Sequence, residues 1–91
     1  MDEVIEKVSE FTGINIGDIR SRKRMHAISE ARQIFVYITM TVYGNSLSSI
    51  AEYLDGRTPQ GISSQMRTFE QQMKIYKGLN KRVNDIKNAI I

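Results

Sequence analysis

Apolar residues recur at helical spacing along the whole chain, and no segment shows the strict alternation that is typical of a strand. The repeat is complete in residues 46–54, where Leu47, Ile50, Ala51 and Leu54 follow the i, i+3, i+4, i+7 pattern. A helix with this spacing places its apolar side chains on one face, which must be buried against a neighbouring helix. The sequence therefore predicts an all-α fold class with five to six helices.

Start and stop signals divide the apolar pattern into helical segments. Glycine accepts the left-handed conformation that ends a helix, and Asn, Ser or Thr side chains cap the N–H groups that begin one. The expected stops are Gly13, Gly44 and Gly78, and the expected caps are Asn15, Ser29, Ser46 and Thr58. The stripes expected to face the core include Phe11 in the first helix and Ile62, Met66, Phe69, Met73 and Tyr76 in the long helix that follows Thr58.

The length and composition restrict the chain to one small domain, residues 1–91, without an active site. A chain of this length buries roughly 60–65% of its unfolded surface, which leaves little room for a closed catalytic cavity. The sequence has no Cys, and His26 is its single His, so thiolate chemistry, disulfides and a histidine metal cage are excluded. We therefore expect no enzyme activity, no catalytic residues, no metal, no cofactor and no small-molecule ligand.

Charge is distributed unevenly, and most of the chain is basic. Residues 1–18 have five acids and one base, whereas residues 19–91 have 12 bases and five acids. The densest basic run, Arg20, Arg22, Lys23 and Arg24, lies in a polar segment that we interpret as a loop over residues 20–28. Such a cluster indicates a polyanionic partner. Because no apolar run could span a membrane and no signal peptide is visible, we expect a cytoplasmic, nucleoid-associated protein.

Residues 46–69 have the layout of a DNA-binding helix-turn-helix. A short helix is followed by a break containing Gly56 and by a second helix that begins at Thr58 and Pro59. The polar face of the second helix comprises Gln60, Ser63, Ser64 and Arg67. Gln pairs with adenine, Arg with guanine and Ser with several base edges, and Gly61 permits close approach to DNA. The pattern predicts a reader of double-stranded DNA, although many helical proteins contain two antiparallel helices joined by a Gly turn.

Several motifs together resemble a known family. They are Asp18-Ile19, Ser21-Arg22-Lys23-Arg24, Ala31-Arg32-Gln33, Ser46-Leu47-Ser48-Ser49-Ile50 and Gly56-Arg57. In order and spacing they resemble the C-terminal DNA-binding domain of the bacterial chromosomal replication initiator DnaA, from Val4 to about Ile86. The resemblance implies a Trp-repressor-like helix-turn-helix that binds double-stranded origin boxes.

The resemblance also implies roles for individual residues. Arg24 matches the loop arginine that enters the minor groove, and the second helix enters the major groove. The resemblance also implies phosphate contacts from Arg32, Gln33, Leu47 and Ser48. From the basic loop itself we further expect phosphate contacts from Arg22 and Lys23, and around the second helix we expect contacts from Arg57, Thr58, Pro59, Gln60, Gly61, Ser63, Ser64 and Arg67.

The start of the second helix departs from the family pattern. The family's Arg-Asp-His-Thr-Thr-Val is here Arg57-Thr58-Pro59-Gln60-Gly61-Ile62, so the usual base-reading side chains are replaced. The departure leaves open a changed site preference, weak DNA binding or lost DNA binding. The chain also has no Walker-type phosphate loop, so it is either an excised domain, with the ATPase module in a longer chain, or a stand-alone relative.

Two alternative functions use the same scaffold. In the first, an exposed apolar patch around Pro59 and Ile62 makes the second helix a protein-interaction module. In the second, the protein is a dimeric helix-turn-helix regulator whose dimer surface is the stripe of Leu79, Val83, Ile86 and Ile90. We expect a monomer rather than a dimer.

Overall fold

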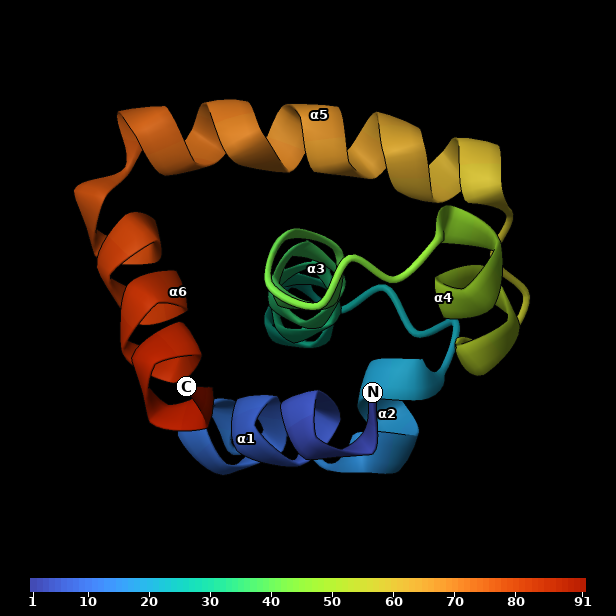
Figure 1. Ribbon diagram of the computed structural model, residues 1–91, viewed down its shortest axis with the longest axis horizontal. Coiled ribbons are helices and arrows are strands. Elements are labelled where there is room, and N and C mark those ends of the chain that lie inside the picture. Colours follow the sequence, from blue (N-terminus) through green and yellow to red (C-terminus); the bar gives the residue numbers. More distant parts are fainter.

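The computed structural model describes residues 1–91 as six α-helices and no strands, which confirms the all-α fold class. The helices are α1 (Asp2–Thr12), α2 (Ile16–Arg20), α3 (His26–Thr41), α4 (Leu47–Tyr53), α5 (Pro59–Ile75) and α6 (Lys77–Ile90). Figure 1 shows the other five helices arranged as a ring around α3, which is seen end-on. None of the six helices has the length and apolar character needed to cross a membrane.

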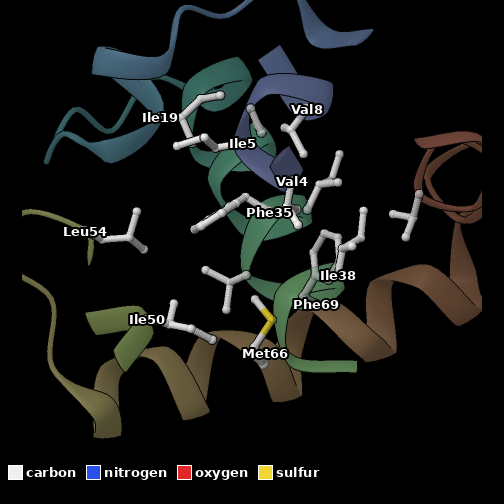
Figure 2. Packing of buried hydrophobic residues seen from close by; sticks show 14 of the residues in the cluster. Val4, Ile5, Val8, Ile19, Phe35, Ile38, Ile50, Leu54, Met66 and Phe69 are labelled. Carbon is white, nitrogen blue, oxygen red and sulfur yellow. The ribbon is translucent and has the colours of Figure 1, made fainter. Parts of the chain in front are cut away.

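The hydrophobic core is built around α3, because this helix packs against all five others. Phe35 and Ile38 are fully buried at its centre, with Val8 of α1 on one side and Phe69 of α5 on the other (Figure 2). The Phe35 ring also lies 5.6 Å from the Tyr53 ring, which brings the end of α4 onto the core. The central helix therefore fixes where the helix-turn-helix lies relative to the rest of the domain.

Most of the predicted helix boundaries are confirmed by local hydrogen bonds. The side chains of Asn15, Ser46 and Thr58 accept hydrogen bonds from backbone N–H groups three residues later, at 2.8, 3.1 and 3.1 Å. Gly13 follows α1 with a φ of 75°, in the left-handed conformation that glycine adopts without strain. Because these interactions lie within one turn of sequence, they can be predicted without tertiary information.

The start of α3 was predicted wrongly. The helix begins at His26 rather than after Ser29, so the basic loop covers residues 21–25 and is shorter than the predicted 20–28. Arg20 is the last residue of α2. The physical reason is burial: Ile28 is buried, and packing this additional turn outweighs the capping preference of Ser29. The other end was also misplaced, since α3 ends at Thr41 and not at Gly44.

The corner between α5 and α6 also differs from the prediction. The break lies at Tyr76, whose extended backbone separates the helices, and Gly78 is part of the first turn of α6. Tyr76 is 61% exposed and Phe11 is 52% exposed, so neither belongs to the core. The chain must turn at this point so that Leu79 of α6 can be buried.

The predicted dimer stripe on α6 is part of the core. Leu79, Val83 and Ile86 are buried within the domain, and Ile90 packs partly against the same cluster. Because these side chains already cover α1, α3 and α5, they do not form the exposed apolar face that the dimeric alternative requires.

Three helices meet at Tyr53. Its hydroxyl donates a hydrogen bond to Asp2 at 2.6 Å, and its backbone carbonyl accepts one from Arg20 Nε at 2.9 Å. The Arg20 guanidinium also lies 4.4 Å from the centre of the Tyr53 ring. Arg20, which the sequence analysis assigned to the basic loop, therefore joins the end of α2 to the end of α4.

The Tyr53 contacts predict a stability change at high pH. Burial, followed by the hydrogen bond to Asp2, raises the pKa of Tyr53 to about 12 from an ordinary value of 10.0. Between these values the unfolded tyrosine ionises while the folded one keeps its proton, so the free energy of unfolding should fall as the pH rises from 10 to 12. Urea unfolding measured between pH 10 and pH 12 should show that the free energy of unfolding falls more steeply with pH for the wild type than for Tyr53→Phe. Tyr43→Phe, which removes an exposed hydroxyl, should behave like the wild type, and equal slopes for all three proteins would contradict the prediction.

Candidate nucleic-acid interface

The basic loop, residues 21–25, is held in place by a buried arginine. Arg32 on α3 is only 3% exposed. Its Nε donates to the carbonyl of Ile19 at 2.7 Å, and its Nη2 donates to the carbonyls of Asp18 and Lys23, each at 3.1 Å. Arg32 therefore binds the backbone on both sides of the start of the loop. These hydrogen bonds position the loop. The phosphate contact expected of Arg32 from the family resemblance stays a prediction.

The first half of the loop makes further contacts with the end of α2. Ser21 Oγ donates to the Asp18 carbonyl at 2.7 Å and accepts from the backbone N–H of Lys23 at 3.2 Å. Lys23 Nζ lies 2.7 Å from the Asp18 carboxylate. The hydrogen bond from Lys23 is the main reason why the pKa of Asp18 lies below its ordinary value. Of the predicted phosphate contacts in the loop, Lys23 is thus already paired with an acid.

The loop and the turn of the helix-turn-helix form one structural unit. The backbone N–H of Asp55 donates to the carbonyl of Arg20 at 2.8 Å. The Arg22 guanidinium lies directly against Gly56 and occupies the space that a Cβ at this position would fill. Gly56 also has a φ of 67°, a conformation that other residues rarely adopt. The turn therefore favours glycine here because of its positive φ, and the exposed Arg22 side chain lies over it.

A polar cavity of about 400 Å³ lies where the loop, α3 and the start of α5 meet. Its lining residues are all polar and include no carboxylate: Arg24, Ser29, Arg32, Gln33, Arg57 and Gln65. The Nε atom of Arg57 is buried and has no hydrogen-bond partner. Burial, followed by the nearby charges of Arg24 and Arg22, lowers the pKa of Arg57, and burial, followed by Arg57, lowers that of Arg32. The cavity therefore concentrates positive charge that no group of the protein neutralises.

A second concavity, of about 410 Å³, follows the start of α5. It is lined by Leu47, Pro59, Gln60, Ser63, Ser64 and Arg67. All six were predicted as site residues, and the structure brings them together at the junction of α4 and α5. At the entrance of α5 the Thr58 hydroxyl caps the helix, and an added Cβ at Gly61 would lie 3.1 Å from that oxygen. Ser48 is exposed in the first turn of α4, next to Leu47.

The polar cavity that contains Arg24, Arg32 and Arg57, the arginine cavity, includes two residues that the sequence did not indicate. Ser29 was interpreted as a helix cap, and Gln65 lies outside the predicted polar face of α5. Both line the arginine cavity. No signal in the sequence could have found them, because Gln65 reaches the cavity only through the tertiary contact between α5 and α3. No group of three or more His, Asp or Glu side chains is placed to hold a metal ion.

Comparison with known families agrees with this architecture. Residues 1–68, which include α1 to α4 and the first part of α5, match the model described as the bacterial dnaA protein helix-turn-helix. The chain belongs to the DnaA helix-turn-helix family. This result confirms the resemblance drawn from the motifs. Because the family consists of DNA-binding domains without catalytic activity, it also confirms that the domain is not an enzyme.

Nearly all of this chain can be aligned with part of several curated DnaA proteins. The chain is 32% identical over 91 residues to the chromosomal replication initiator protein DnaA of Campylobacter concisus and 30% identical to that of Campylobacter curvus. It is 33% identical over 89 residues to the same protein of Mycoplasma capricolum. These alignments include 98–100% of this chain but only 20–21% of each relative. The chain therefore spans about one fifth of the length of these relatives.

Proposed function

We propose that this DnaA-family domain binds double-stranded DNA of the origin-box type, with the basic loop in the minor groove and the start of α5 in the major groove. The observation that carries the proposal is the cavity in which Arg24, Arg32 and Arg57 converge without a carboxylate. Like charges at close range are unfavourable unless an anion lies between them. The phosphate backbone of a duplex supplies such anions at regular intervals.

Phosphate contacts and base contacts are assigned to different parts of the surface. The proposed phosphate contacts are Arg22, Lys23, Arg32, Gln33, Arg57 and Ser48, together with the backbone N–H groups at Leu47. Arg32 also supports the others by holding the loop. The proposed base contacts are Arg24 in the minor groove and Gln60, Ser63, Ser64 and Arg67 in the major groove. Thr58, Pro59 and Gly61 shape the start of α5 so that it can approach the bases.

The relatives suggest the setting in which the domain acts. They are named chromosomal replication initiator proteins and are about five times as long as this chain. We propose that the domain acts in replication initiation, as the DNA-binding part of a longer protein that also contains an ATPase module. We propose that the domain itself is a monomer, since the α6 stripe is used within its own core.

The structure gives no support to the protein-interaction alternative. That alternative requires an exposed apolar patch at the start of α5, but Ile62 is 1% exposed and Pro59 is half-buried. The neighbouring side chains in the groove are mostly polar. The surface therefore fits a polar, anionic ligand better than an apolar protein face.

Fluorescence anisotropy with three labelled duplexes at several salt concentrations tests the proposed function. The duplexes contain an initiator-type box, a scrambled box and a random pool. We expect binding that weakens steeply with salt, with a slope of about −0.9 for each phosphate neutralised. Preference for the box would show that the family's site preference survives the altered start of α5. Equal binding to all three would show that the base preference has changed, and absence of binding at low salt would refute the proposal.

Gln60→Ala should change the sequence preference of the domain more than its overall affinity. Gln60 is exposed in the groove at the start of α5, where a side-chain amide can make two hydrogen bonds to one adenine. Site selection from a random pool should therefore give a relaxed preference at one base pair, which corresponds to a loss of about 1–3 kcal/mol of discrimination. Gln71→Ala, which changes an exposed glutamine farther along the same helix, serves as the control. Identical selected motifs for the wild type and Gln60→Ala would contradict the prediction.

A further inference from the structure

The basic loop ends in an exposed apolar residue whose position neither burial nor helix capping explains. Met25 is 69% exposed and lies between the exposed residues Arg24 and His26. It makes no contribution to the hydrophobic core. Most of its apolar surface therefore lies in water and is free to be covered by a ligand, which would stabilise the complex.

Met25 also occupies a position where a polar side chain would stabilise the fold. It is the N-cap residue of α3, and its carbonyl accepts the first hydrogen bond of the helix from the Ser29 N–H at 2.8 Å. Its side chain makes no capping hydrogen bond, and the first turn of α3 contains no acid. The caps of α2, α4 and α5 are polar side chains that accept such a bond. Ser or Asp is strongly preferred at this position, so the methionine is present at a cost to helix stability.

The backbone before Met25 is fixed, so the side chain is presented in a defined place. Arg32 holds the Lys23 carbonyl at 3.1 Å, and the helix begins directly after Met25. Arg24, the residue between these two anchors, lines the acid-free arginine cavity. An anionic ligand drawn into that cavity would therefore contact the residue directly before Met25.

From these observations we infer that Met25 is an apolar contact residue of the DNA interface. It packs against the deoxyribose and base edges of the groove that Arg24 enters. Methionine is flexible and apolar, and apolar side chains including methionine are used by DNA-binding proteins to contact and wedge the minor groove. This inference rests on the proposed function, and it adds a contact that contributes to affinity without contributing charge.

The test compares three variants in duplex binding and thermal unfolding. Met25→Ser removes the apolar contact and introduces a capping side chain, Met25→Leu keeps the apolar contact, and Ile75→Ser removes an exposed apolar residue at the far end of α5. For Met25→Ser we expect an approximately tenfold loss of duplex affinity together with a melting temperature about 4–8 °C higher. The salt dependence of binding should stay unchanged, because no charge is removed. Met25→Leu and Ile75→Ser should retain the affinity of the wild type.

The opposite signs of the two effects separate a contact role from a structural role. A Met25→Ser protein that binds as tightly as the wild type would overturn the inference. So would a loss of affinity that accompanies a lower melting temperature, or an equal loss in Met25→Leu. If the wild type itself binds no duplex, the proposed function fails and the inference fails with it. If the wild type binds and Met25→Ser is unchanged, the inference alone is wrong.

Discussion

Arg32→Met should lower the free energy of unfolding by about 2–4 kcal/mol, because it removes a buried donor that serves three backbone carbonyls. Methionine keeps the apolar stem but leaves the Ile19 carbonyl, among others, without its partner. Part of the loss is offset because the charge facing Arg57 is also removed. Urea unfolding followed by circular dichroism measures the change.

The same substitution should weaken duplex binding, since the loop carrying Arg24 loses its anchor. Arg32→Lys tests whether charge or geometry is responsible, because a lysine keeps the charge but cannot reproduce the planar fork of the guanidinium. We expect it to be nearly as destabilising as Arg32→Met. Arg67→Met removes an exposed arginine and should change stability by less than about 0.5 kcal/mol. An Arg32→Met protein as stable as the wild type would show that the three hydrogen bonds contribute no net stability.

Arg24→Ala should weaken binding to the preferred duplex by about 1–3 kcal/mol, the size of a good base contact. Arg24 is exposed and lies in the arginine cavity, so its removal leaves the fold intact and relieves repulsion with Arg57. The melting temperature should therefore stay the same or rise slightly. Anisotropy titrations with the preferred and the scrambled duplex should show the larger loss for the preferred one.

Lys74→Ala is the matched control for Arg24→Ala. It removes one positive charge from an exposed position near the end of α5, away from the loop. If the domain bound DNA only through its net charge, the two variants would lose affinity equally at low salt. That outcome, or an unchanged affinity for Arg24→Ala, would remove the basic loop from the binding mechanism.

The sequence was most informative where a structural feature depends on neighbouring residues. The caps at Asn15, Ser46 and Thr58 are hydrogen bonds that span three residues, so residue type and spacing were sufficient to predict them. The groove along the start of α5 was also predicted, because helical periodicity alone places Gln60, Ser63, Ser64 and Arg67 on the face opposite the buried stripe.

The predictions were wrong where packing outweighed local preference. Ser29 is a good cap by residue type, yet α3 begins earlier because Ile28 is buried. Tyr76 continues the apolar stripe in sequence, yet it is exposed because the chain turns there to bury Leu79. At both positions a local preference, for a cap at Ser29 or for continuing the helix through Tyr76, is opposed by the burial of an apolar side chain. Burial contributes the larger free energy.

The sequence by itself thus determined the helices, most of their ends and the polar face of α5, because these depend on contacts within one or two helical turns. The arginine cavity depended on the tertiary structure. Arg57 lies 25 residues after Arg32 and 33 residues after Arg24 in the sequence. The three arginines converge only when α3 holds the loop and the turn after α4 closes against it. Their unneutralised charge follows from that convergence, since each arginine alone would be an ordinary solvated cation.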